Sequence, residues 1–334
     1  MHRGLFTAAG VLLALGGVFA RTAHAQSCCS LVSEDEISVV PRHRRALLTS
    51  RLSAKHMLFL HDRGGQSHPL GDDVSATDLV LAVGGGLRFP FYDRLQLNGI
   101  LPIRTQLRTL PSADGADSAT AVGAGDAALF LRWSALDDDE RGLCDPAASA
   151  RPSLDLFAGT KLPTGRYADG PEARDLARTT GDGSAALIAG VTVLKYIGST
   201  HGARLSLRYV HHFPRDSRTA LTGYDSFTEG DQLGVTAGYW LSHGMRWLFG
   251  ATLDSTWTLA SSASAPGASS ETLADSEMRQ ASVSLQVTRV LRMPNLDLTL
   301  AIGSDLPLPA LSANVSWEGV QASLALRYHF LDPG

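Results

Sequence analysis

The chain has 334 residues, 44% of them hydrophobic, and its 29 Lys and Arg against 33 Asp and Glu give a formal net charge of −4. This length suits one or two soluble domains or one large β architecture. The acidic balance disfavours a nucleic-acid partner, because proteins that bind nucleic acids present a basic surface.

The first 25 residues have the pattern of a secretory signal peptide. Arg3 precedes an apolar run at 8–20, and Ala23-His24-Ala25 forms a small-x-small cleavage site. The alternative, an N-terminal membrane anchor, is disfavoured because the run is shorter than the roughly 20 residues of a spanning helix. We therefore expect a signal peptide at 1–25 and a periplasmic N-terminal segment at 26–45. Cleavage of the signal peptide removes Arg3 and Arg21 and leaves 27 basic against 33 acidic residues.

Alternation of apolar and polar residues dominates the chain after residue 45. In one example Leu205, Leu207 and Tyr209 alternate with polar residues such as Arg204 and Ser206. Runs of about 9–11 residues are long enough for a tilted β-strand to cross a bilayer. We predict twelve strands, near residues 46–60, 77–89, 94–105, 125–135, 153–162, 184–196, 203–213, 231–242, 246–259, 278–291, 295–303 and 319–330.

The connections between these strands alternate in length. If the first strand starts in the periplasm, the connections outside the cell are long and those inside are short, apart from 136–152. This is the pattern of an outer-membrane barrel. The sequence therefore predicts an all-β fold, a transmembrane antiparallel up-and-down β-barrel over 46–330 with a tail at 331–334. We expect it in the cell outer membrane, with outer-membrane lipids as partners.

Aromatic residues fall at the ends of the predicted strands, where amphipathic rings favour the membrane–water boundary. Those at periplasmic ends are Phe89, Trp133, Tyr196, Tyr239, Trp247, Tyr328 and Phe330, and those at outer ends are Phe213 and Trp257. The last strand ends in Arg327-Tyr328-His329-Phe330, which is similar to a terminal signal for the outer-membrane assembly machinery.

The polar face of the strands predicts a basic lumen. The inward basic candidates are Arg51, Lys55, Arg88, Arg94, Arg104, Arg132, Lys161, Arg204, Arg208, Arg246 and Arg327, against Asp78, Asp126, Asp155, Asp254 and Asp297. We expect Arg94, Arg104, Arg204 and Arg208 to form a constriction that favours anions. The alternative is that these side chains pair across strands and fill the interior.

Three cysteines fall in segments expected on the oxidising periplasmic side, where disulfides form. Cys28 and Cys29 follow the cleavage site, and Cys144 lies in the one long inner turn. One of the pair can bond Cys144 and tether the N-terminal segment beneath the barrel. A vicinal Cys28–Cys29 disulfide is the rival, and lipidation of Cys28 is disfavoured because Ala25 stands where a lipobox prefers Leu.

Motifs of enzymes and cofactor sites are missing from the sequence. It contains no Gly-x-Ser-x-Gly, His-Glu-x-x-His or Cys-x-x-Cys, and Gly84-Gly85-Gly86 lies inside a predicted strand. His211-His212 at the outer rim favours a polar loop junction over a metal site. We therefore expect neither enzyme, metal nor cofactor, although a barrel hydrolase with Ser and His distant in sequence is a third alternative.

Two stretches resemble a known family of outer-membrane proteins. They read Gly-Ala-Gly-Asp-Ala-Ala-Leu-Phe-Leu-Arg-Trp at 123–133 and Gly-Thr-Lys-Leu-Pro-Thr-Gly at 159–165. The family is named after the meta-cleavage pathway of phenol degradation, and the resemblance implies a barrel that transports small, including aromatic, molecules. We therefore expect a channel or transporter for small anionic or aromatic solutes, with a structural or surface-binding barrel as the alternative.

Overall fold

The computed structural model describes residues 39–40, 45–61, 67–70, 74–112, 115–136, 152–166, 180–181, 183–197, 200–216, 226–243, 246–264, 269–272, 277–291, 295–306 and 316–330. No helix within these ranges is long and apolar enough to cross a membrane.

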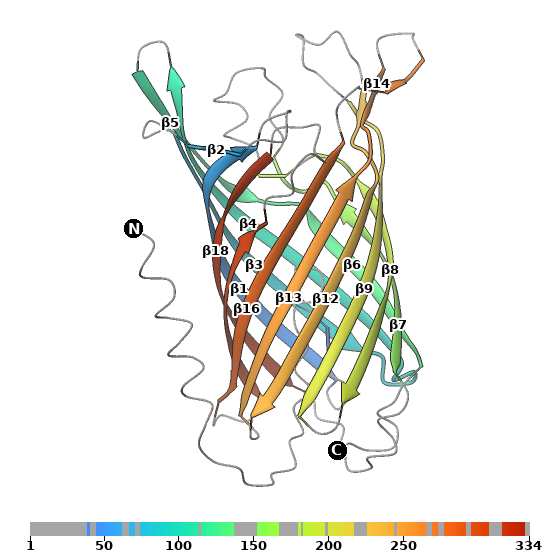
Figure 1. Ribbon diagram of the computed structural model, residues 1–334. Helices are drawn as coiled ribbons and strands as arrows, with labels where there is room; N and C mark the ends of the chain where they lie inside the picture. Colours follow the sequence, from blue (N-terminus) through green and yellow to red (C-terminus); the bar gives the residue numbers. More distant parts are fainter. Residues whose placement is uncertain are drawn as a thin grey trace, which may run out of the picture.

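Twelve antiparallel strands form a closed barrel (Figure 1). The sheet closes because the first strand pairs with both the second and the last, so that Ala46 lies opposite Leu87 on one side and Phe330 on the other. The barrel strands are β1 (Ala46–His61), β3 (Ser75–Arg88), β4 (Leu95–Ser112), β6 (Ala127–Leu136), β7 (Ser153–Leu162), β8 (Ala186–Ile197), β9 (His201–His212), β12 (Gln232–His243), β13 (Trp247–Thr258), β16 (Met278–Val290), β17 (Leu296–Asp305) and β18 (Ser316–Phe330).

The predicted fold class and the twelve predicted strands are confirmed, with strand ends displaced by a few residues. The connections at 89–94, 198–200, 244–246 and 291–295 are short, and they share one end of the barrel with the start of β1 and the end of β18. Outer-membrane barrels have short periplasmic turns and longer outer loops. This end is therefore assigned to the periplasm, and the opposite end to the outside.

Six shorter strands lie in segments that the sequence predicted as outer loops or loop ends: β2 (Ser67–Pro69), β5 (Gly115–Ala124), β10 (Arg215–Asp216), β11 (Ser226–Thr228), β14 (Ser262–Ser264) and β15 (Glu271–Thr272). The prediction of a loop at 106–124 is wrong: β4 continues to Ser112 and pairs with β5. Figure 1 shows the end of this hairpin extending above the neighbouring strands of the barrel. β10, β11, β14 and β15 form a separate small sheet.

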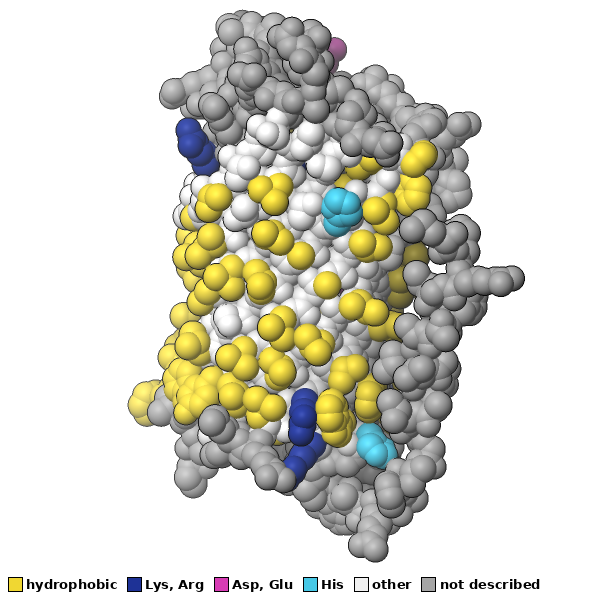
Figure 2. Space-filling model, turned by 90° about the vertical axis from the view of Figure 1, so that its left-hand side faces the viewer, with side chains coloured by type: hydrophobic (Ala, Val, Ile, Leu, Met, Phe, Trp, Pro, Cys, Tyr) yellow, Lys and Arg dark blue, Asp and Glu magenta, His cyan; other side chains and the backbone are white. Residues whose placement is uncertain are grey.

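The barrel is polar inside and apolar outside. On β9, Leu205, Leu207 and Tyr209 are 47%, 42% and 45% exposed, whereas the intervening Arg204 and Ser206 are 4% and 9% exposed. A soluble protein buries its leucines and exposes its arginines. Figure 2 shows one side of this wall, where hydrophobic side chains cover most of the height and the Lys, Arg, Asp and Glu side chains lie near the two ends. Lipid is the solvent that suits this surface.

Inward-facing aromatic rings lie over glycines of the neighbouring strand. Phe130 is paired with Gly159, Phe157 with Gly190 and Trp240 with Gly202. A Cβ atom at these three glycines would approach the paired ring to 2.5, 2.3 and 2.0 Å, respectively, which is too close for any side chain. Strand β7 therefore packs against both of its neighbours: its Phe157 covers Gly190 of β8, and its Gly159 leaves room for the Phe130 ring of β6.

An apolar cluster narrows the interior near the periplasmic end. Trp240 and Leu248 are buried, and Leu194, Tyr196 and Val290 pack against them. The rings of Tyr196 and Trp240 meet edge to face with centroids 5.9 Å apart. The expectation that Tyr196 belongs to the boundary belt is wrong, since the register of β8 turns this ring inward. Among the other predicted belt residues, Trp133, Tyr239, Trp247 and Tyr328 are exposed on the outside.

Candidate functional site: the barrel lumen

The lumen is lined by polar side chains that the barrel wall buries. Residues at inward register positions such as Arg88, Asn98, Arg204, Gln286 and Arg327 are each at most 7% exposed. Several hydroxyls pair across strands, as in Thr192–Ser206 and Thr288–Thr299, each with 2.8 Å between the oxygens. These inward side chains therefore supply a hydrogen-bonding surface.

A cavity of about 220 Å³ lies within this surface. It is bordered by residues from β1, β7, β9, β12, β13, β16, β17 and β18, so it spans much of the barrel's cross-section. Of the described residues that line it, Arg51, Arg208, Arg327 and Asp254 are charged and Phe157 is the one aromatic residue. The cavity thus carries more positive than negative charge.

Charged groups around the cavity interact with one another. Thr236 donates a hydrogen bond from Oγ1 to Asp254 Oδ1 at 2.6 Å. Arg204 interacts electrostatically with both Asp254 and Arg327. Closer to the periplasm, Asp297 Oδ2 lies 2.9 Å from His329 Nε2. Asp254 and Asp297 therefore each have a partner in this part of the lumen.

Two ion pairs toward the outer half join residues that the sequence did not pair. Lys55 Nζ lies 2.6 Å from Asp305 Oδ2, and Arg108 Nη2 lies 2.5 Å from Asp78 Oδ1. Arg108 and Asp305 were absent from the predicted inward set because the predicted strands ended before each of them. The strand ends, rather than the alternation, limited that prediction.

The four arginines expected at a constriction do not form one ring. Of the four, Arg208 alone borders the cavity. Arg204 is buried below it, and Arg94 lies in the turn before β4, at the periplasmic end. Arg104 lies further out along β4, with its Nε near Gly125. Arg246, also predicted to point inward, is exposed in the turn before β13.

Two other predicted lumen residues, Arg132 and Lys161, have partners on neighbouring elements. Arg132 is 5% exposed, and its Nη1 lies 3.5 Å from Asp155 Oδ2. Its guanidinium also lies 5.1 Å from the centre of the Phe157 ring. Lys161 Nζ donates to Ser184 Oγ at 3.4 Å. These contacts tie β6, β7 and the segment before β8 together.

Asp126 takes part in a junction that joins the two motifs used for the family resemblance. Gly165 N donates to Asp126 Oδ1 at 2.9 Å, and Thr164 Oγ1 donates to Gly125 O at 2.7 Å. Thr180, which is 1% exposed, donates to Ala124 O at 2.6 Å. A side chain at position 165 would clash, because a Cβ there would lie 2.5 Å from the Gly181 backbone. The motifs therefore build the outer mouth of the barrel.

Val40 lies inside the periplasmic mouth, which the sequence did not predict. It is 1% exposed, its N donates to Gln96 Oε1 at 3.0 Å, and its O accepts from Arg88 Nη2 at 2.9 Å. Both partners face the lumen from β4 and β3. The apolar pair Val39-Val40 was the available signal, but its two residues are too few to show a periodicity.

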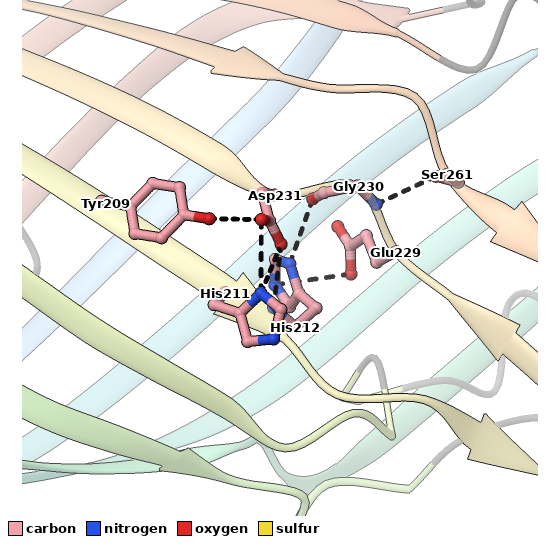
Figure 3. A network of polar contacts seen from close by, with 7 residues as sticks. All are labelled: Tyr209, His211, His212, Glu229, Gly230, Asp231 and Ser261. Carbon is pink, nitrogen blue, oxygen red and sulfur yellow. Dashed lines mark hydrogen bonds and ion pairs between the residues drawn. The ribbon is translucent and has the colours of Figure 1, made fainter. Parts of the chain in front are cut away.

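A polar network joins β9 to the turn before β12 at the outer rim (Figure 3). Tyr209 donates to Asp231 Oδ2, and His211 Nδ1 lies 3.0 Å from Asp231 Oδ1. His212 points to the other side of the strand, where its Nδ1 donates to Gly230 O at 3.1 Å. Gly230 N in turn donates to Ser261 Oγ at 3.1 Å. The His-His pair thus forms the polar loop junction that the sequence favoured.

Burial alone would raise the pKa of Asp231. Hydrogen bonds from Tyr209 and His211, the charge of His211 and the His212 N–H outweigh burial and lower that pKa. The carboxylate is therefore ionised under ordinary conditions and can hold both strands.

Some predictions fall outside the described residues. These are the signal peptide at 1–25, the tail at 331–334 and the disulfide candidates Cys28, Cys29 and Cys144. Within the described ranges, no three His, Cys, Asp or Glu side chains are grouped so that they could hold a metal ion.

The fold is similar to that of an outer-membrane channel of known structure, and weaker likenesses extend to other outer-membrane barrels. The outer-membrane channel COG4313 from Pseudomonas putida F1 has 13% sequence identity and a TM-score of 0.65 over 90% of this chain and 100% of its own. The toluene transporter TbuX from Ralstonia pickettii has 9% identity and a TM-score of 0.41 over 86% and 90%. The translocator domain of the autotransporter NalP from Neisseria meningitidis has 10% identity and a TM-score of 0.42 over 89% and 91%.

No family model matches the chain, and no curated protein matches it. The resemblance to the family of the phenol meta-cleavage pathway therefore stays a prediction. The structural likeness to the Pseudomonas putida channel shows the fold, which is that of a barrel of the Gram-negative outer membrane.

Proposed function

We propose that this barrel is a channel through which small anionic solutes cross the outer membrane. The observation that carries the proposal is the cavity, whose lining holds Arg51, Arg208 and Arg327 against Asp254. Positive charges inside low-dielectric walls focus the field and raise the local concentration of anions. The wall around the cavity supplies hydroxyls and amides that can replace part of a solute's hydration shell.

The alternative is a structural or surface-binding barrel without transport. It is supported by structure at both ends of the barrel. Val40 and the Trp240 cluster occupy the interior at the periplasmic end, and β10, β11, β14 and β15 form a small sheet at the outer end. A barrel of this kind would hold charged side chains only to fill its interior.

Solute flux into liposomes separates the two functions. The full mature chain is reconstituted, and the uptake of acetate, glycerol and tetramethylammonium is compared with that of empty liposomes. The channel predicts that acetate enters fastest and tetramethylammonium slowest. Replacing Arg51 and Arg208 together by Gln should lower the acetate rate and leave the glycerol rate unchanged. Flux equal to that of empty liposomes for all three solutes would favour the structural barrel.

A further inference from the structure

The cavity in the lumen differs from a site for purely hydrophobic solutes. Pockets for such ligands are lined mostly by hydrophobic and aromatic side chains. Among the described residues that border the cavity there are eight serines and threonines and two glutamines, whereas Phe157 is the only aromatic ring. A lining of this composition offers many hydrogen bonds and one apolar face.

Arg51 is suited to take the charged end of a ligand. It borders the cavity from β1 and is half-buried, and its side chain makes no hydrogen bond or ion pair with any residue in the part of the chain that the structure describes. A guanidinium has five N–H donors in a fork that matches a carboxylate. An incoming carboxylate would therefore bind there without displacing an existing partner.

Asp254 is suited to take a hydroxyl group. One of its oxygens accepts from Thr236 at 2.6 Å, and a carboxylate accepts up to about four hydrogen bonds. A carboxylate repels simple anions, so its presence among three arginines makes sense for a ligand that also donates hydrogen bonds. Gln286 and Gln321, which also border the cavity, offer both donors and acceptors.

From this arrangement we infer that the cavity is a binding site for a small polyhydroxylated carboxylate of the sugar-acid class. Its carboxylate lies on Arg51, its hydroxyls on Asp254 and the Ser, Thr and Gln side chains, and its C–H face on Phe157. The volume of about 220 Å³ is below the roughly 300–1,000 Å³ of pockets for drug-sized ligands, which fits one sugar ring. The inference rests on the proposed function and names the solute class of the same lumen.

Calorimetric titration of the detergent-solubilised barrel with four probes tests the inference. The probes are D-glucuronate, D-glucose, acetate and benzoate. Glucuronate should bind at one site and at least roughly tenfold more tightly than each of the others, because a site built to hydrogen-bond hydroxyls rejects analogues that lack them. Benzoate binding as tightly as glucuronate would assign the cavity to aromatic acids instead, and no binding of glucuronate would overturn the inference.

Two variants assign the roles of the residues. Arg51→Gln should weaken glucuronate binding by roughly tenfold or more and leave glucose unaffected, because a charge-assisted hydrogen bond is lost. Asp254→Asn should bring the affinities for glucuronate and acetate closer together. The control is Arg289→Gln, a cation that lies over Trp247 on the outer face, 4.9 Å from the ring centre. If Arg51→Gln and Arg289→Gln changed glucuronate binding equally, Arg51 would not be the residue that binds the carboxylate.

The titration and the flux measurement can fail separately. Flux of acetate without binding of glucuronate would overturn the sugar-acid site and keep the anion channel. Binding of glucuronate in a barrel that passes no solute would overturn the channel and keep the site.

Discussion

The two halves of the barrel interior are built differently. From β6 to β9 the interior is filled by Phe130, Phe157, Ile188 and Val210, with rings seated over glycines of the next strand. From β12 round to β1, outside the Trp240 cluster at the periplasmic end, it is lined by hydroxyls, amides and charges, and the cavity opens there. The comparison teaches that the same alternation of side chains gives a packed apolar wall on one side of the interior and a cavity with a polar lining on the other.

The packed half should be the more sensitive to added volume. Gly190→Ala would place its Cβ within 2.4 Å of both the Phe157 ring and the Leu207 carbonyl oxygen. We expect a loss in the free energy of unfolding of about 3 kcal/mol, at the upper end for overpacking. Urea unfolding of the barrel in lipid vesicles measures it.

The matched control for this change lies on the polar half. Gly234 also faces the lumen, but the nearest atom to a Cβ there is the flexible Arg208 side chain at 3.3 Å. Gly234→Ala should therefore change the stability by less than about 0.5 kcal/mol. Equal losses for both variants would contradict the difference between the two halves.

The ion pair at the edge of the packed half should have a smaller effect. Arg132→Met leaves the half-buried Asp155 carboxylate without its ion-pair partner and removes the cation from the Phe157 ring. We expect a loss of about 2 kcal/mol in the same unfolding measurement. Replacing Asp155 by Leu in the same chain should recover much of that loss, since apolar residues can replace a buried pair. No recovery would mean that Arg132 acts through contacts other than this pair.

The order of the strands was open to prediction because the alternation of side chains is local. The run Leu205, Ser206, Leu207, Arg208, Tyr209 shows by itself which residues face lipid, and the barrel's closure follows from repeating that pattern twelve times. The interior was less predictable. The partner of Phe157 is Gly190, 33 positions away, and nothing near either residue indicates the pairing.

The height of a side chain along the barrel also escaped prediction. We grouped four arginines because all of them fall on the inward half of the alternation: Arg94, Arg104, Arg204 and Arg208. Barrel strands are tilted and staggered, so residues that face inward need not lie at the same level along the barrel axis. Asp126 was predicted to face the lumen, but it accepts a hydrogen bond from the backbone of Gly165, which follows the end of β7. Local patterns give the face of a residue, whereas the register between strands gives its neighbours.

Acid should change the stability of the outer rim by less than the substitutions above change the stability of the barrel. The pKa of Asp231 is lowered in the folded protein, so its contribution to stability is present above the unfolded value of about 3.9 and is lost as the pH falls through the folded value. Below about pH 4 the amide of Gly230 should exchange faster with deuterium. Asp231→Asn should abolish this pH dependence, and an unchanged dependence would show that another group causes it.

The measurement that tests the central claim most directly is the reversal potential of single barrels in a KCl gradient. The positive lining at Arg51, Arg208 and Arg327 predicts a potential shifted toward that of chloride, and a smaller shift when Arg51 and Arg208 are both replaced by Gln. A potential shifted toward that of potassium, or one that the double replacement leaves unchanged, would contradict the claim that the arginines lining the cavity make the barrel favour anions.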